Sequence, residues 1–319
     1  MTHTIKTPRL LAAGALVALV ATGLSTLSAQ QPRVHVNPVV AKLAAGGTVV
    51  GISTGDLSME NARTVAQADA DFVRIDMEHT PMDFTALRDF MIGMTDKRTA
   101  LRKGNAQPDV APFARFAPYG RDQVQWVSKQ ALDLGLMGIA FNTIENVAQT
   151  LTAVTSMRYP PARTDKFKEP AGIRGIGSEW ASWLWGVDNY RSHADLWPLN
   201  PEGDLLAVMM IETVEGIKNI DAIAKVPGVG VLWVAASSDL AASYGLPGSA
   251  PELEAARQTM LKACIANKVV CGINPTNAAD AAKRVKEGWR YIEVGRIGGL
   301  AAGPSAMIDA VKKSAVKAQ

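Results

Sequence analysis

The chain has 319 residues, of which 48% are hydrophobic and 20% are charged, which is typical of a globular protein with a large core. Its formal net charge is only +3, and Lys6 and Arg9 supply two of these charges from a segment that we expect to be removed. The remaining chain is almost neutral and has no cluster of Lys and Arg, which excludes nucleic acid as a main partner, because that binding needs a concentrated basic face.

The first 29 residues have the pattern of a secretory signal peptide. Lys6 and Arg9 precede an almost entirely apolar run over 10–24, and Ser28 and Ala29 are small residues suited to cleavage. The run of 15 residues is shorter than the ~20 needed to cross a bilayer. We therefore expect a cleaved signal, residues 1–29, and keep a retained membrane anchor as the alternative. Cleavage would leave an exported protein, periplasmic or secreted, without a membrane span.

From residue 30 onward, short apolar runs alternate with amphipathic stretches. The expected strands are 48–53, 72–76, 111–115, 138–141, 205–211, 229–234, 269–273 and 291–294. The expected helices are 59–68, 84–95, 122–134, 144–157, 214–224, 251–267, 278–287 and 303–313. The strands do not alternate polar and apolar residues, which indicates that both faces are buried. Eight strands alternating with eight helices predict one domain over 30–319, an α/β fold of the (β/α)8 TIM barrel type.

A doubly wound open sheet is the alternative fold. It is less well supported, because no G-x-G-x-x-G motif or P-loop follows any expected strand.

Residues 159–205 interrupt this alternation. The segment holds five prolines and four tryptophans (Trp180, Trp183, Trp185 and Trp197), and it is too long for a plain connection. It follows the fourth strand–helix unit. We consider two interpretations, an aromatic plug or subunit interface and a lid over the active site, and the sequence leaves both open.

Cys264 and Cys271 are the two cysteines of the chain, seven residues apart. An exported protein can form a disulfide, and this one would close a short loop. Two buried free thiols fit the sequence equally well. Neither cysteine has a histidine nearby in the sequence, which argues against zinc binding or catalysis.

Polar residues gather where the expected strands end, the edge at which TIM barrels carry their active sites. Asp76, Glu78 and His79 end the second strand, and Arg115 ends the third. A single such residue is more often a helix cap or a surface ion-pair partner. Several on one rim favour a catalytic site, with His79 as the proton-transfer group.

Two further carboxylates follow later strands. Glu212 follows the fifth expected strand, and Asp239 follows the sixth after Ser238. Two carboxylates suit a hard cation such as Mg²⁺ or Mn²⁺, which prefers oxygen ligands and leaves positions open for substrate. Such a metal would act as a Lewis acid on a carbonyl oxygen. With a single candidate histidine, a histidine-rich zinc site is not expected.

Several segments together resemble the HpcH/HpaI aldolase/citrate lyase family. The resemblance covers most of the chain from about Pro38 and rests on segments 76–81 (DMEHTP), 158–161 (RYPP), 172–178 (GIRGIGS), 211–213 (IET) and 238–240 (SDL). It implies a metal-dependent class II pyruvate aldolase on a (β/α) barrel. Such an enzyme cleaves 4-hydroxy-2-oxo acids to pyruvate and an aldehyde.

The resemblance also implies residue roles. Glu212 and Asp239 become the ligands of a divalent metal, Mg²⁺ or Mn²⁺ with Co²⁺ as a further candidate. His79, oriented by Asp76, becomes the base at the 4-hydroxyl, and Arg115 polarises the 2-oxo oxygen.

Two further implications concern substrate binding and assembly. Backbone N–H groups at Ser238 and Asp239 would bind the substrate carboxylate, as helix N-termini bind anions. The family also forms homo-oligomers, in which we expect the helix at 302–313 to be exchanged between subunits.

The chain departs from the family pattern at three places. Residues 235–238 (AASS) replace the usual Gly-Pro-Ala before the second acidic ligand, Met210 stands where Gln is usual, and residues 163–170 are inserted. These changes, together with export, motivate an alternative function: a non-catalytic protein that binds a metal or an oxo acid on an aldolase scaffold. Cleavage of a CoA ester is less expected, because no basic surface for a CoA phosphate is evident.

Overall fold

The structure is a computed structural model, and it describes Met1 and residues 35–116, 124–177, 179–235, 237–297 and 304–316. The predicted signal peptide, apart from Met1, lies outside the described residues. Residues 34–319 form one compact unit.

Eight parallel strands close into a barrel, which confirms the predicted fold. Their order around the barrel is β1-β2-β3-β4-β6-β7-β8-β9, with β9 paired to β1 and β4 paired to β6. The strands are β1 Val49–Thr54, β2 Phe72–Met77, β3 Ala111–Phe116, β4 Gly138–Phe141, β6 Leu205–Met210, β7 Val231–Val234, β8 Val270–Ile273 and β9 Tyr291–Arg296. A two-residue strand, β5 (Leu196–Trp197), pairs with the start of β6.

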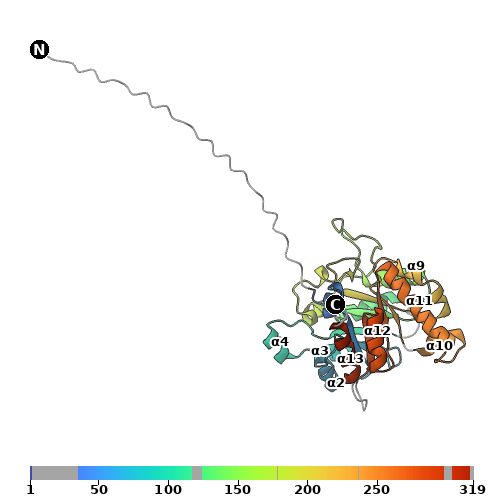
Figure 1. The fold of residues 1–319 in the computed structure, drawn as a ribbon. Helices are drawn as coiled ribbons and strands as arrows, with labels where there is room; N and C mark the ends of the chain where they lie inside the picture. Colours follow the sequence, from blue (N-terminus) through green and yellow to red (C-terminus); the bar gives the residue numbers. More distant parts are fainter. Residues whose placement is uncertain (2–34, 117–123, 178, 236, 298–303, 317–319) are drawn as a thin grey trace. The chain divides into compact units, whose positions relative to one another are not determined.

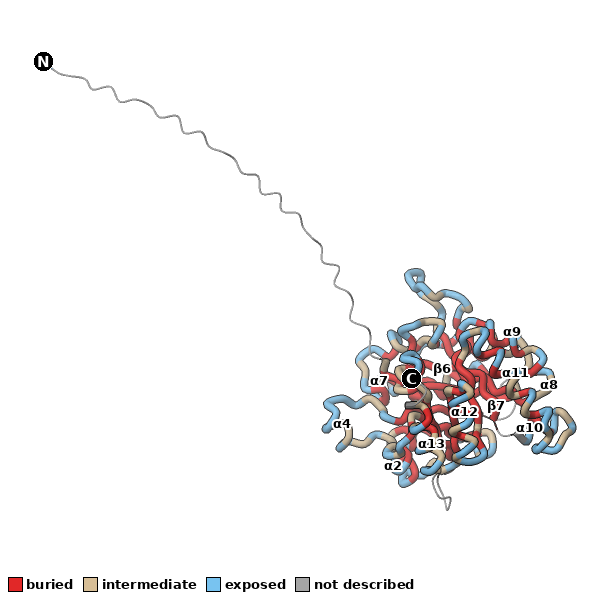
Figure 2. Tube along the Cα trace, viewed as in Figure 1, coloured by how far each residue is buried: buried red, intermediate tan, exposed pale blue. Residues whose placement is uncertain are grey.

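Helices surround the strands, so that the strands are buried and the outer helical faces are exposed (Figures 1 and 2). The helices are α1 Pro38–Ala44, α2 Met59–Ala66, α3 Phe84–Gly93, α4 Lys97–Lys103, α5 Val124–Asp133, α6 Val147–Met157, α7 Glu179–Trp185, α8 Val214–Lys218, α9 Ile220–Ala224, α10 Ser237–Tyr244, α11 Pro251–Asn267, α12 Ala278–Glu287 and α13 Ser305–Val316, with a 3₁₀ turn at Tyr190–Ser192.

Aromatic rings fill the barrel interior near the N-terminal ends of the strands. Phe72 stacks on Tyr291 with ring centroids 4.3 Å apart, and Phe113 stacks on Phe72 at 5.5 Å. Gly51 makes room for these rings, because a Cβ there would lie 2.0 Å from the Phe72 ring. This part of the barrel interior is therefore a packed core and not a channel.

Several elements differ from the expectations. Helix α1 comes before the first expected strand and was not among the expected helices; the Asn37 side chain accepts from the N–H groups of Val39 and Val40, and Pro38 starts the helix. The expected helix at 214–224 divides at Asn219 into α8 and α9. The C-terminal helix α13 packs against α12, β1 and β9 of its own chain, and its exchange between subunits stays a prediction.

The proline- and tryptophan-rich segment lies on the N-terminal face of its own barrel, which corrects the lid interpretation within one chain. It connects the C-terminal end of α6 to the first residue of β6. A helix that follows a barrel strand runs back to the N-terminal edge, so the connection after it lies opposite the active face. Trp185 is buried and donates to the carbonyl of Gly135, which fits the plug interpretation.

Two buried arginines hold this segment in place. Arg158 donates to both carboxylate oxygens of Asp195, at 2.7 and 3.1 Å, and to two backbone carbonyls. Arg174 donates to Asp133 at 2.8 Å and lies over the ring of Tyr159, with its guanidinium carbon 4.5 Å from the ring centroid. The arginines of the RYPP and GIRG motifs therefore stabilise the fold at the face away from the predicted site.

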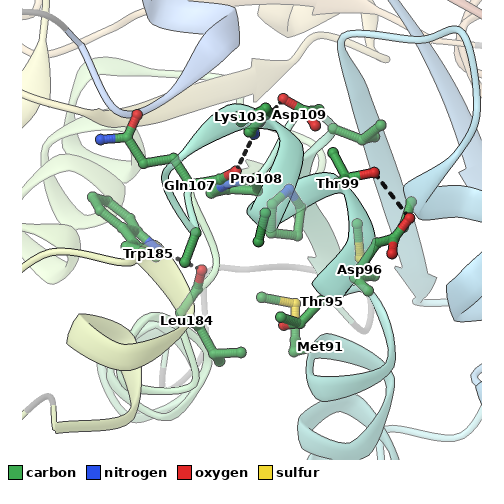
Figure 3. A pocket seen from close by; sticks show the side chains of 17 residues that line it. Met91, Thr95, Asp96, Thr99, Lys103, Gln107, Pro108, Asp109, Leu184 and Trp185 are labelled. Atoms are coloured by element: carbon green, nitrogen blue, oxygen red, sulfur yellow. Dashed lines mark hydrogen bonds and ion pairs between the residues drawn. The ribbon is translucent and has the colours of Figure 1, made fainter.

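A pocket on the same face lies between α4 and α7 (Figure 3). Its polar side chains bond to one another: Lys103 donates to Asp109, and Thr99 donates to Asp96 (Figure 3). Because barrel enzymes carry their chemistry at the opposite face, we do not assign the active site to this pocket.

Cys264 of α11 and Cys271 of β8 form a disulfide, with Cα atoms 5.8 Å apart. This decides between the two alternatives that the sequence left open. Within the described part of the chain, no helix combines the length and the apolar character needed to cross a membrane.

Candidate active site at the barrel mouth

The mouth of the barrel, the rim formed by the carboxyl ends of the strands, carries the predicted site residues on β2, β3, β6 and the segment after β7. At its centre, Asp76 of β2 and Arg115 of β3 are opposite each other in the sheet register. Arg115 Nη2 donates to Asp76 Oδ2 at 2.8 Å, and its Nε donates to Oδ1 at 3.3 Å. Burial would raise the pKa of Asp76, but the bond from Arg115 and the charge of Arg74 lower it to about 2. Asp76 is therefore a permanent anion that fixes the Arg115 guanidinium.

His79 lies at the solvent edge of this group, with 63% of its side chain exposed. Asp76 Oδ1 accepts the backbone N–H of His79 at 3.4 Å, so Asp76 holds the turn that carries this residue. The described contacts include no hydrogen bond from Asp76 to the His79 ring, and the nearest acidic atom to the ring is Glu78 Oε2, 3.6 Å from Nε2. Orientation of the ring by Asp76 itself stays a prediction.

Glu212 follows β6 and is buried, with 7% of its surface exposed. Its Oε2 accepts from the backbone N–H of Thr143 at 3.2 Å. Burial and then the charge of Asp239 raise the pKa of Glu212 to about 7, and the charge of Glu78 adds to this. Glu212, Asp239 and Glu78 therefore form one acidic group, in which the charges of the other two carboxylates both act on Glu212.

Thr143 adopts an unusual backbone conformation beside this carboxylate. Its φ is 52°, in the left-handed region that is costly for a β-branched residue. The conformation directs its N–H toward Glu212. Strain of this kind is concentrated at functional sites, where surrounding structure holds it in place.

Ser238 and Asp239 lie in the first turn of α10, and both are exposed. Ser238 Oγ lies 3.2 Å from Asp239 Oδ2 and donates to it. Asp239 makes no ion pair with any residue in the described ranges, and neither does Glu212. The position at the start of a helix agrees with the expected binding of a carboxylate by backbone N–H groups.

The acidic group fits a divalent cation. Arg115 is bonded to Asp76, and its Nη1 lies 2.7 Å from Glu78 Oε2. The charge of Arg115 only partly offsets the raised pKa of Glu212. Neither Glu212 nor Asp239 forms an ion pair among the described residues. A buried carboxylate whose pKa is raised by a second carboxylate favours either a proton or a cation nearby. Oxygen donors alone suit Mg²⁺ or Mn²⁺. Asp76, Glu78 and His79 also offer ligand atoms within 4.8 Å of one another, although the bond to Arg115 occupies Asp76.

The sequence did not identify every residue of the site. The sequence places Glu78 at the strand end without indicating a role for it, yet burial raises its pKa even beside Arg115. Arg74 and Glu293 form a buried ion pair beneath Asp76, with Arg74 Nε 2.7 Å from Glu293 Oε2. Charged residues inside otherwise apolar expected strands were the available signal for that pair.

A family model matches residues 57–304, and its description is HpcH/HpaI aldolase/citrate lyase. The chain belongs to the HpcH/HpaI aldolase/citrate lyase family. Both the predicted family and the predicted class, an enzyme of the aldolase and lyase type, are confirmed by this match and by the names of relatives.

Two relatives illustrate the likeness. The 5-keto-4-deoxy-D-glucarate aldolase of Enterobacter sp. (strain 638) is 28% identical over 87% of this chain and 97% of its own. The hydroxypyruvate/pyruvate aldolase of Roseobacter denitrificans is 28% identical over 81% of this chain and 90% of its own. Among solved structures, an HpcH/HpaI family protein from Burkholderia cenocepacia J2315 has a TM-score of 0.67 at 25% identity, covering 88% of this chain and 98% of that one.

Proposed function

We propose that this protein is a divalent-metal-dependent aldolase that cleaves a 4-hydroxy-2-oxo acid to pyruvate and an aldehyde. The observation that carries the proposal is an acidic group, Glu212 and Asp239, that forms no ion pair among the described residues and lies beside an arginine fixed by Asp76. The names of the two aldolases above support the same chemistry.

Glu212 and Asp239 would hold the metal, with Mg²⁺ or Mn²⁺ as the expected ion and Co²⁺ as a further candidate. When bound, the metal would supply Lewis acidity toward the 2-oxo and carboxylate oxygens of the substrate. The N–H groups at Ser238 and Asp239 would bind that carboxylate. Together, these contacts would hold the substrate so that its C3–C4 bond lies above the rim of the barrel.

Cleavage begins at the 4-hydroxyl. His79 accepts the hydroxyl proton, the C4–O bond becomes the aldehyde carbonyl, and the C3–C4 bond breaks. The electron pair of that bond passes into the enolate of pyruvate, which is then protonated at C3. Exposure of His79 to solvent allows it to exchange its proton between turnovers.

Arg115 stabilises the charge that develops on the 2-oxo oxygen. Asp76 fixes the guanidinium before substrate binds, so little reorganisation is needed when the charge appears. Replacing His79 with Ala should impair cleavage more than exchange of the pyruvate methyl protons, since the base is needed at the 4-hydroxyl. Equal losses in both reactions would refute this role.

We also propose that the protein acts outside the cytoplasm. The signal pattern of residues 1–29 and the disulfide between Cys264 and Cys271 support export, because disulfides persist in oxidising compartments. A homo-oligomer is proposed as well. Exposed Ile173, Ile176, Trp180 and Trp183 offer an apolar surface on which a second copy could pack.

The test measures pyruvate release from a panel of 4-hydroxy-2-oxo acids by the mature protein with Mg²⁺, with Mn²⁺ and with chelator. Release that requires metal supports the aldolase. Metal binding without release from any substrate would refute it and favour the alternative, an exported protein that binds a metal or oxo acid without turnover.

A further inference from the structure

Two arginines lie beside Asp76, and only one of them is bonded to it. Arg115 Nη2 donates to Asp76 Oδ2 at 2.8 Å. Arg74, which precedes Asp76 on β2, has its Nη1 3.5 Å from the same oxygen, which is longer than an ordinary N–H···O bond. All three side chains are buried. Since either cation could bond to this carboxylate, the surrounding residues must determine which arginine does so.

Glu293 of β9 holds Arg74 through two bonds. Arg74 Nε donates to Glu293 Oε2 at 2.7 Å, and Nη2 donates to Oε1 at 2.8 Å, the paired geometry that makes arginine–carboxylate contacts strong. Glu293 is itself fixed, because Asn274 Nδ2 donates to its Oε1 at 3.3 Å, and Trp233 Nε1 donates to Asn274 Oδ1 at 2.7 Å. The Trp233 ring also lies against the arginine, with its centroid 5.3 Å from the Arg74 guanidinium carbon.

Arg74 keeps one unused donor next to Asp76. Its Nη1 is buried and has no hydrogen-bond partner among the described residues. A buried donor without a partner costs free energy, so Arg74 would gain a bond by turning toward Asp76. The two bonds to Glu293 oppose this movement. At its present distance the charge of Arg74 still helps to lower the pKa of Asp76, while the bond itself goes to Arg115.

We propose that Glu293 is a positioning residue, which retains Arg74 so that Asp76 is left to fix Arg115. The inference rests on the proposed function, because it takes Arg115 as the group that stabilises the enolate. If Arg74 were bonded to Asp76, Arg115 would lose part of this anchor and would keep Glu78 as its other described carboxylate contact. Its direction would then change, and stabilisation of developing charge depends on donors that are fixed in advance.

The first experiment is the crystal structure of Glu293→Gln, which needs neither metal nor turnover. The substitution removes the charge that holds Arg74 and keeps an oxygen that can accept from Asn274. Arg74 should then lie at about 2.9 Å from Asp76, an ordinary hydrogen-bond distance, and Arg115 should lose at least one of its two bonds to that carboxylate. Arginines that stay in their wild-type places would overturn the inference. Glu293→Asp, which keeps the charge on a shorter side chain, should give a smaller shift and serves as the second variant if the first does not fold.

The second experiment measures how well Arg115 is positioned. Calorimetry with Mg²⁺ compares oxalate, which resembles the enolate of pyruvate in shape and charge, with pyruvate itself. Glu293→Gln should weaken oxalate binding about tenfold, as expected for one charge-assisted hydrogen bond, and should weaken pyruvate binding less. Adding Arg74→Met removes the competing cation and should recover most of the loss. Asp195→Asn, which removes the charge from the two-bond pair with Arg158 on the N-terminal face, is the matched control and should leave both affinities unchanged.

Recovery in the double variant separates positioning from a purely structural role. If the pair of Arg74 and Glu293 only stabilised the fold, the variants would differ in the free energy of unfolding, and folded molecules would bind oxalate equally well. If Arg74 itself served the site, the double variant would bind oxalate more weakly than Glu293→Gln. Either result would overturn the inference. If the wild type with Mg²⁺ binds neither oxalate nor pyruvate, the proposed function fails, and the crystal structures still decide whether Glu293 controls the pairing of Asp76.

Discussion

The two ends of the barrel differ in how far their charged side chains form ion pairs. On the N-terminal face, Arg158 and Arg174 are each bonded to an aspartate, and buried Asp204 lies between two histidines. At the mouth, burial and the charge of Asp239 raise the pKa of Glu212, the charge of Arg115 offsets this only in part, and neither carboxylate forms an ion pair among the described residues. Charge that is balanced within the chain stabilises the fold, whereas charge left without an ion-pair partner at the strand ends is available to a ligand. Each prediction below tests this contrast.

The largest effect is expected for Glu212→Gln. The variant should lose Mg²⁺ binding and at least about a thousandfold in kcat together, because removal of one strong electrostatic contribution alone costs 10²–10³. Calorimetry and pyruvate release measure the two losses. Normal activity in this variant would refute the ligand assignment.

The same variant should also be more stable without metal. The pKa of Glu212 is raised to about 7 in the folded protein, above its ordinary value, so its contribution to stability is present below pH 4.5 and is lost as pH rises through 7. At pH 8 with chelator, Gln should therefore stabilise the fold by up to about 2–3 kcal/mol. Urea unfolding at pH 5 and pH 8 measures this, and the wild type should show the larger decline.

The opposite result is expected on the other face. Arg174→Met leaves the carboxylate of Asp133 without this arginine and removes the guanidinium between Tyr159 and Tyr190. Breaking a buried ion pair costs about 3–5 kcal/mol, and partial exposure of Asp133 places the expected loss at the lower end. Because the face is remote from the mouth, kcat per folded molecule should stay unchanged. A variant with normal stability and lost activity would reverse the contrast.

The barrel itself follows from the sequence because its signals are local. Unbroken apolar runs such as those at β3 and β6 are typical of strands buried on both faces, and their regular alternation with helices implies closure. The position of Asp76, Arg115, Glu212 and Asp239 on the rim is equally predictable, since each lies at the end of a recognisable strand or within five residues after it. This is why the sequence predicts the fold and the rim on which these side chains lie, while their roles stay predictions.

Contacts that depend on three-dimensional geometry could not be predicted. The residue pattern does not predict the bulge in β9, where Gly51 of β1 pairs with Glu293 but Ser53 pairs with Arg296, because a bulge depends on how two strands pair. The pairing of Asp76 with Arg115 in place of the His79 ring likewise depends on side-chain directions. The lid interpretation of 159–205 failed for a simpler reason: its position after α6, and not after a strand, already places it on the N-terminal face.

A smaller effect is expected for Arg115→Ala, the counterpart of Arg174 at the mouth. Loss of its interaction with enolate charge should lower kcat about a hundredfold, with a smaller change in KM, because this interaction is strongest in the transition state. Arg115→Lys should restore only part of the rate, since lysine cannot pair with Asp76 through two nitrogens. A raised KM with an unchanged kcat would mean that Arg115 only binds substrate.

The smallest effect is expected for the disulfide, which joins the end of α11 to the start of β8 near the N-terminal face. Cys264→Ala with Cys271→Ala should lower the free energy of unfolding by about 2 kcal/mol, because the bridge closes a loop of seven residues and stabilisation falls with loop length. Kinetic constants should not change, as the bridge is remote from Glu212. Thiol titration of the wild type purified after export is the control. Free thiols there, or a loss of kcat in the double variant, would contradict the assignment of this bridge to stability alone.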